Sequence, residues 1–147
     1  MNKNKIPTAA LLALLFSTAA QAETHEVKML NRSAAGSMVY EPDFVKLSPG
    51  DSIRFIATHN GHNAASLPSV MPAGATPFKG KINEQLQVTF DQPGFYAIQC
   101  IPHLAMGMVM LVQVVGGDQP APVFPADLPP AASQRLSAIV QRALLAQ

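Results

Sequence analysis

Residues 85–99 read QLQVTFDQPGFYAIQ, and this stretch decides the fold class. Every second residue from Leu86 to Phe90 is apolar, and the residues between them are polar. A period of two is typical of a β-strand with one buried face and one exposed face. The segment 91–94 then contains the Pro-Gly pair of a tight turn, and the apolar run at 95–99 predicts a second strand. The stretch therefore indicates short strands that are separated by turns.

The same signals recur on both sides of this stretch. Further strands are predicted at 27–30, 44–47, 52–57 and 109–115. The residues SPGD at 48–51 indicate a hairpin-like turn. Residues 58–81 show no clear period, so we expect an irregular loop with at most one helical turn. Short strands at regular intervals are typical of an antiparallel β-sandwich, so the fold class that we predict is all-β.

Composition changes after the last predicted strand. Five prolines at 118–130 exclude a regular helix there, whereas 133–146 is rich in Ala, Leu, Gln and Arg and predicts a helix. Its apolar positions fall at helical spacing and are Leu136, Ile139, Val140 and Leu144. We therefore expect a core domain at 23–117 and an extension at 118–147, in which a proline-rich linker leads to a helix packed on the sandwich.

The first 22 residues have the features of a secretory signal peptide. Lys3 and Lys5 precede an apolar run, and AQA at 20–22 has small residues at the two positions that a signal peptidase reads. The run is too short to span a bilayer. Removal of 1–22 leaves eight basic and nine acidic residues, a net charge of −1, which favours neither nucleic acid nor a membrane surface as partner. We expect a periplasmic protein.

Cys100 is the single cysteine of the chain. Exported domains usually use cysteines in disulfide pairs, so an unpaired cysteine needs another explanation. It could be an inert buried thiol, half of an intermolecular disulfide, a nucleophile or a metal thiolate. The residues around it must decide between these alternatives.

The segment QCIPHLAMGM at 99–108 favours the metal thiolate. His103 follows Cys100 by three residues and Met108 follows it by eight, so one loop offers three donors. A thiolate, two imidazoles and a weak thioether form the donor set of blue copper, because soft sulfur stabilises Cu(I) and imidazole suits Cu(II). His62, just after a predicted strand, is the candidate for the second imidazole.

Two other functions could use the same residues. A nucleophile pair of Cys100 and His103 would need an orienting group and an oxyanion site, and a base only three residues along the loop is poorly placed. We therefore expect no enzymatic activity. A copper-buffering protein would use the same ligands without needing a rigid site, and clusters of surface methionines would support it. Met29 and Met71 are scattered instead.

The loop CIPHLAMGM at 100–108 resembles that of the pseudoazurins, a family of cupredoxins whose loop reads CTPHYGMGM, and GHN at 61–63 resembles the segment with their first ligand histidine. The similarity covers nearly the whole mature chain, at VKMLN (27–31), MVYEP (38–42), PGD (49–51), FKGKINE (78–84) and GMV (107–109). The resemblance implies a cupredoxin-like Greek-key β-sandwich of about eight strands with a C-terminal helical extension.

The resemblance also implies one type 1 copper ion as the cofactor. His62, Cys100 and His103 would form its trigonal plane, and Met108 would be the axial ligand. Met106 is the rival axial ligand, because its distance from His103 along the chain matches the shorter loop of the amicyanins. The choice of Met108 follows the pseudoazurin spacing.

By the same resemblance, the side chain of Asn63 would tie the two ligand loops together, and its backbone N–H would approach the cysteine sulfur. Contacts of this kind tune the potential and the rigidity of a metal site. Met38 matches a position that packs beside the exposed ligand histidine. The implied function is one-electron transfer by a monomer whose redox partner is a copper nitrite reductase, another denitrification enzyme or a c-type cytochrome.

The edge of His103 is the expected port for electrons. Three apolar neighbours could form a small docking patch around it, namely Pro102, Leu104 and Ala105. Pseudoazurins commonly surround this port with lysines, and the basic residues that remain here are Arg32, Lys79 and Lys81. Asn60 and Gln99 are uncharged residues near the two ligand segments, so we expect weak electrostatic steering of partners.

Overall fold

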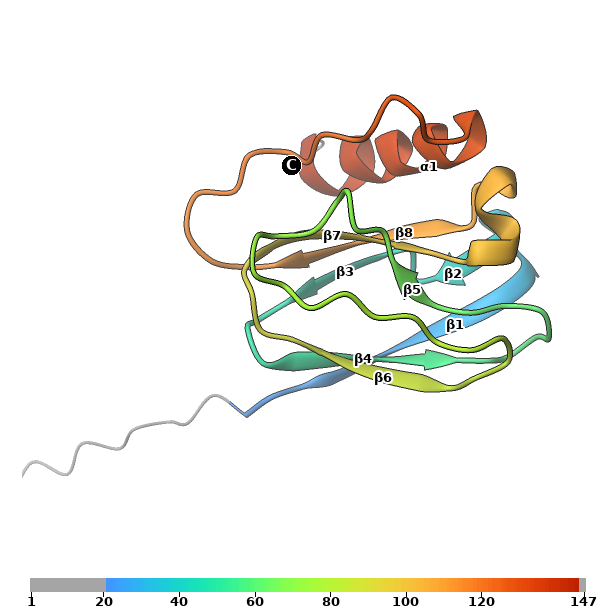
Figure 1. Ribbon diagram of the computed structural model, residues 1–147, viewed down its shortest axis with the longest axis horizontal. Helices are drawn as coiled ribbons and strands as arrows, with labels where there is room; N and C mark the ends of the chain where they lie inside the picture. Colours follow the sequence, from blue (N-terminus) through green and yellow to red (C-terminus); the bar gives the residue numbers. More distant parts are fainter. Residues whose placement is uncertain (1–20, 146–147) are drawn as a thin grey trace, which may run out of the picture.

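The computed structural model describes residues 21–145, so most of the predicted signal peptide lies outside the described residues. Two four-stranded sheets face each other (Figure 1). The first has the order β2-β1-β4-β6, with β1 Thr24–Ser33, β2 Gly36–Glu41, β4 Asp51–Ile56 and β6 Leu86–Phe90. The second has the order β3-β8-β7-β5, with β3 Phe44–Leu47, β5 Ala65–Ser66, β7 Gly94–Gln99 and β8 Val109–Val114. The predicted all-β Greek-key sandwich is confirmed.

The expectation of an antiparallel sandwich is wrong for two strand pairs. β1 pairs with β4 in parallel, and β3 pairs with β8 in parallel. The turn at 48–51 is no hairpin, because it joins β3 of one sheet to β4 of the other. The turn at 91–94 likewise joins β6 to β7 across the two sheets. A local turn signal shows that the chain reverses, but the choice of neighbouring strand depends on long-range packing.

Two strands have no counterpart among the predicted ones. β2 contains Met38 in the left-handed region, with φ of 51°, which interrupts any regular strand pattern. β5 has two residues, and it exists because Ala65 pairs with Gln99 of β7 while also bridging to Lys79. The alternation at 86–90 is confirmed, since apolar β6 residues are more buried than the polar residues between them.

The C-terminal helix covers one face of the second sheet. In Figure 1, α1 (Pro130–Val140) lies over β7 and β8, and one π-helical turn, η2 (Gln141–Leu145), continues it. Four α1 side chains are buried: Ala132, Leu136, Ile139 and Val140. Leu144 packs against the same cluster, so the predicted docking face is confirmed. Within residues 21–145, no helix has both the length and the apolar character needed to cross a membrane.

The segments of interest meet at one end of the sandwich. A 3-10 helix, η1 (Ile101–Met106), connects β7 to β8, and the loop after β4 carries His62. Figure 1 shows both connections at the same end of the sheets. The hydrophobic core between the sheets reaches this end, where Cys100 and Met108 are among its fully buried residues.

Candidate metal centre

A tight backbone network shapes the loop that follows β7. Cys100 has an extended backbone, and its N–H donates to Met108 O at 3.0 Å. The N–H of His103 donates back to Cys100 O at 3.1 Å, and the N–H of Met108 donates to His103 O at 3.1 Å. Gly107 ends η1 with φ of 82°, a conformation that favours glycine. The three donors of this loop are therefore held by hydrogen bonds between their own backbones.

The second loop brings His62 to the same place from a distant part of the chain. Gly61, with φ of 93°, turns the chain after β4, and its N–H donates to Asn83 Oδ1 at 2.7 Å. The N–H of Asn83 in turn donates to His62 O at 2.8 Å. His62 is fully buried, although it belongs to a loop. These contacts lock the imidazole against the end of the core.

Three donor atoms form a small triangle. His62 Nδ1 lies 3.1 Å from His103 Nδ1 and 3.8 Å from Cys100 Sγ, and His103 Nδ1 lies 3.5 Å from the same sulfur. The point equidistant from these corners is about 2.0 Å from each, close to the ~2.0–2.1 Å of metal–imidazole bonds and somewhat short of the ~2.3 Å of a metal–thiolate bond. One thiolate and two imidazoles suit copper. The donors therefore fit a copper ion.

Asn31 orients the imidazole of His62, and the sequence did not point to it. Its Oδ1 lies 2.7 Å from His62 Nε2, and an amide oxygen only accepts, so Nε2 carries the proton and Nδ1 keeps its lone pair. Burial lowers the pKa of His62, and the imidazoles of His103 and His59 lower it further. The ring is thus prepared as a neutral ligand. Asn31 lies within β1, and no local signal marks its role.

The environment of Cys100 favours metal ligation over nucleophilic catalysis. Burial raises the pKa of the thiol, while hydrogen bonds from the backbone N–H groups of Asn63 and His103 lower it. The net shift is upward, so the free protein holds little thiolate at neutral pH, and the side chain is fully buried. A bound cation would remove the proton and stabilise the thiolate.

The two candidate axial methionines differ in burial. Met108 is fully buried in the cluster that contains Cys100, whereas 52% of the surface of Met106 is exposed. Met38 is partly buried against the same cluster. A thioether that faces solvent is poorly placed to meet donors inside the sandwich, so burial favours Met108 as the fourth ligand.

Asn63 joins the two loops. Its Oδ1 accepts from the N–H of Ile101 at 2.8 Å, and its Nδ2 donates to Gly80 O at 3.0 Å. The hydroxyl of Tyr40 donates to Asn63 O at 2.7 Å. Asn63 is only 2% exposed; its bonds with Gly80 and Tyr40 are buried, and its bond with Ile101 is partly buried.

We expect Asn63→Ala to lower the free energy of unfolding by about 2 kcal/mol or more, because it leaves two backbone groups without partners at roughly 1–3 kcal/mol each. Copper affinity should fall about 10-fold to 100-fold. Urea denaturation of the metal-free protein and competition with a chelator measure the two effects. The exposed Asn60→Ala is the matched control and should change stability by less than about 0.5 kcal/mol. Equal stability of the two variants would contradict this role of Asn63.

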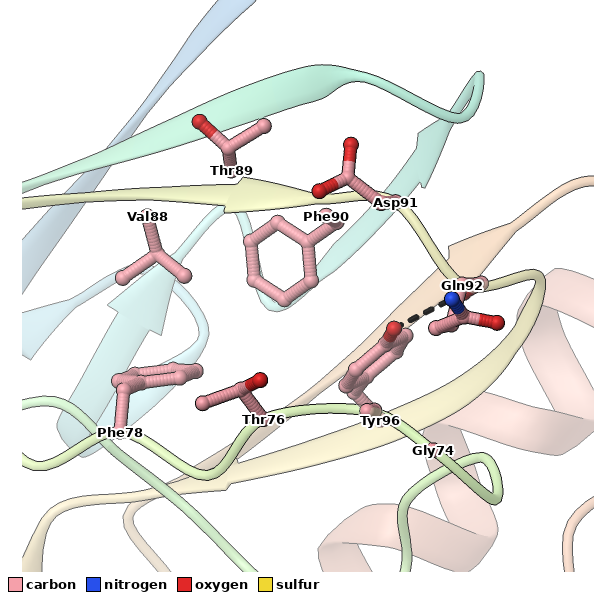
Figure 2. Close-up of a pocket in the computed structure, with 10 residues that line it drawn as sticks. Gly74, Thr76, Phe78, Val88, Thr89, Phe90, Asp91, Gln92 and Tyr96 are labelled. Atoms are coloured by element: carbon pink, nitrogen blue, oxygen red, sulfur yellow. Dashed lines mark hydrogen bonds between the residues drawn. The ribbon is translucent and has the colours of Figure 1, made fainter.

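A separate pocket at 74–96 contains none of the candidate ligands. Figure 2 shows the rings of Phe78, Phe90 and Tyr96 turned toward it, while Thr89 and Asp91 point to the other side of β6. The hydroxyl of Tyr96 donates to Gln92 O at 2.8 Å, so this hydroxyl already has a hydrogen-bond partner in the wall of the pocket. This pocket offers no donor set for a metal.

The surface around His103 is mostly apolar. His103 is half-buried, while the three other candidate ligands are fully buried. Exposed residues beside it include Pro102, Ala105 and the large side chains of Ile101 and Met106. Lys79 and Lys81 are exposed along a shallow groove that also includes Ile82 and Pro102. The expected port therefore opens on an apolar surface with two lysines nearby.

Comparisons with known proteins agree with this geometry. The family model of copper-binding proteins, plastocyanin/azurin family, matches residues 27–115. A pseudoazurin of Paracoccus pantotrophus is 49% identical over 112 residues, which are 76% of this chain and 74% of that protein. The crystal structure of pseudoazurin from Methylobacterium extorquens matches with a TM-score of 0.75 and 36% identity over 81% of this chain and 98% of that one. That of Hyphomicrobium denitrificans pseudoazurin matches with a TM-score of 0.69 and 33% identity, over 82% and 98%.

Proposed function

Because this chain belongs to the plastocyanin/azurin family of copper-binding proteins, and within it to the pseudoazurins, we propose that it holds one copper ion through His62, Cys100, His103 and Met108. It is a blue copper electron-transfer protein. The observation that carries the ligand set is the triangle of Cys100 Sγ and the two histidine Nδ1 atoms. The buried thioether of Met108 is the fourth donor.

A copper ion in such a site supplies a reversible one-electron change between Cu(II) and Cu(I). The chain holds the ligands in positions that need not change with the oxidation state of the copper. Asn31 fixes the ring of His62, Asn63 ties the His62 loop to η1, and backbone bonds hold Cys100 to Met108. Burial of three ligands excludes water. The site transforms no substrate, so we assign no enzymatic activity to it.

Electrons would enter and leave at the edge of His103. Small apolar contacts suit a short-lived complex between redox partners. A copper nitrite reductase or a c-type cytochrome of a denitrifying or respiratory chain fits this role, and the protein would act as a monomer. Since Asn60 is exposed and uncharged, electrostatic steering would depend mainly on Lys79 and Lys81.

An optical titration tests the proposed function. Adding Cu(II) to the purified metal-free protein should produce an intense blue colour at one equivalent, and ascorbate should bleach it reversibly. The colour requires a thiolate bound to Cu(II), so a protein that only buffers Cu(I) would stay colourless. A colourless protein with bound copper would overturn the proposal.

We also propose export to the periplasm with cleavage after Ala22, which would make Glu23 the first residue of the mature chain. The nitrogen of Glu23 lies 2.8 Å from Asp51 Oδ1, and Asp51 Oδ2 accepts from the N–H of Ser48 at 2.7 Å. Cleavage after Ala22 would turn the nitrogen of Glu23 into an α-ammonium group beside this carboxylate. Processing would therefore add an ion pair to the start of β1.

We expect Asp51→Asn to lower the urea midpoint of the chain that begins at Glu23 at pH 7. Hydrogen bonds from Glu23 and Ser48 lower the pKa of Asp51, so its stabilising effect is present above the unfolded pKa of about 3.9 and is lost as pH falls through the lower folded value. The two proteins should thus converge in acid. The exposed Asp118→Asn serves as control, and mass spectrometry of the exported protein checks the cleavage site. Equal midpoints at pH 7 would contradict the prediction.

A further inference from the structure

Arg135 connects α1 to two segments beside the candidate copper site. Its Nη1 donates to Met38 O and to Gly107 O, each at 2.6 Å, and its Nη2 donates to Ser37 O at 3.2 Å. The side chain is half-buried. One guanidinium group of the helix thus binds both β2 and the end of the ligand loop.

The carbonyl of Gly107 belongs to the peptide that precedes Met108. The N–H of this same peptide donates to His103 O at 3.1 Å, so the peptide is held by the ligand loop on one side and by Arg135 on the other. Ala131 of α1 packs directly on Gly107, since a Cβ added there would lie 2.8 Å from Ala131 O. The helix and its arginine therefore fix the backbone from which the Met108 side chain starts.

Met38 is held in a conformation that is costly for a residue other than glycine. Its φ of 51° lies in the left-handed region, which non-glycine residues adopt only where surrounding contacts compensate for the strain. The bond from Arg135 to Met38 O is such a contact. Met38 packs on the cluster that contains Cys100 and Met108, so the same guanidinium supports a second wall of the site.

Within residues 21–145, no carboxylate forms a direct ion pair with Arg135. Burial lowers the pKa of Arg135, and the charge of the Asp43 carboxylate raises it. The hydrogen bond to Asp43 Oδ1 comes from Arg142, whose Nη2 lies at 2.6 Å. Guanidinium groups stay protonated at neutral pH. A cation near copper disfavours Cu(II) relative to Cu(I), because Cu(II) has the higher charge.

We propose that Arg135 is a positioning residue of the copper site, which sets the position of Met108 through the Gly107 carbonyl and raises the reduction potential by its charge. This inference rests on the ligand set proposed above. It assigns to the C-terminal helix a part in the function of the site as well as in the packing of the sandwich.

Two substitutions separate the hydrogen bonds from the charge. Arg135→Met removes both, and Arg135→Lys keeps the charge but lacks the planar fork that reaches two carbonyls. Arg142→Met is the matched control, because it removes an arginine of the same helical segment that bonds to Asp43 and not to the ligand loop. Copper affinity, reduction potential and the electron paramagnetic resonance spectrum are measured for each holoprotein.

We expect Arg135→Met to lose about 10-fold in copper affinity, to have a lower potential and to show an altered spectrum. Arg135→Lys should retain most of the potential and show a smaller loss of affinity, and Arg142→Met should match the unmodified protein. If Arg135→Met does not fold, the same measurements on Arg135→Lys test the role of Arg135.

This inference alone would be overturned if the unmodified protein is blue and both Arg135 variants match Arg142→Met in copper affinity, reduction potential and spectrum. A lower melting temperature of the Arg135 variants would not change that conclusion. Failure of both variants to fold would likewise assign Arg135 to folding and overturn the inference. A colourless unmodified protein would instead overturn the ligand set itself. The two failures are therefore distinguishable.

Discussion

Cys100→Ser should abolish the blue absorption of the copper-loaded protein completely. The colour of a type 1 site arises from charge transfer between the cysteine thiolate and Cu(II), and Cys100 is the single cysteine of the chain. A serine hydroxyl at this buried position stays protonated and cannot replace the soft sulfur donor.

The measurement is a visible spectrum during addition of Cu(II), with circular dichroism to confirm that the variant folds. His25→Ala is a suitable control, since it removes an imidazole outside the triangle of donors and should keep the full colour. A blue Cys100→Ser protein would exclude Cys100 as the thiolate ligand and, with it, the proposed centre.

Met108→Ala should destabilise the metal-free protein by about 2–5 kcal/mol, because it opens a cavity in a fully packed region. Met106→Ala should change stability by less than about 0.5 kcal/mol, because that side chain faces solvent. The difference follows from burial alone, with Met108 at 0% exposure and Met106 at 52%. Urea denaturation of the two metal-free variants measures it.

The role of Met108 as a ligand needs a variant that keeps the packing. Met108→Leu conserves volume and should cost less than about 1.5 kcal/mol, yet it removes the axial donor. Loss of the thioether electron pair should destabilise Cu(II), which has the higher charge, more than Cu(I), and should therefore raise the reduction potential. Voltammetry of the Met108→Leu and Met106→Leu holoproteins provides the comparison. A raised potential in the Met106 variant alone would make Met106 the axial ligand.

Local patterns predicted much of the fold. Alternation at 86–90 and the apolar run at 109–115 correspond to β6 and β8, and the predicted helix corresponds to α1 with η2. Two strands were missed: the left-handed Met38 interrupts the pattern of β2, and β5 has only two residues, which pair with β7 far along the chain. The parallel pairs were missed because turn residues report a reversal and not the sheet that the next strand joins.

The sequence by itself determined the local part of the site. Cys100, His103 and Met108 lie in one short loop, so their spacing along the chain and the chemistry of their side chains are visible before folding. The same holds for the apolar stripe of the C-terminal helix. Interactions between residues a few positions apart leave a readable pattern.

Only the tertiary structure decided which distant groups meet this loop. His62, which the sequence offered as a candidate, reaches Cys100 from 38 residues away. Asn31 reaches His62 from 31 residues away, and Arg135 binds Gly107 across 28 residues, and neither was expected. A single polar residue at such separation carries no local pattern, because its partner is chosen by how the sheets and the helix pack. The tertiary structure also determines which side chains are buried, and burial distinguishes Met108 from Met106 as the candidate axial ligand.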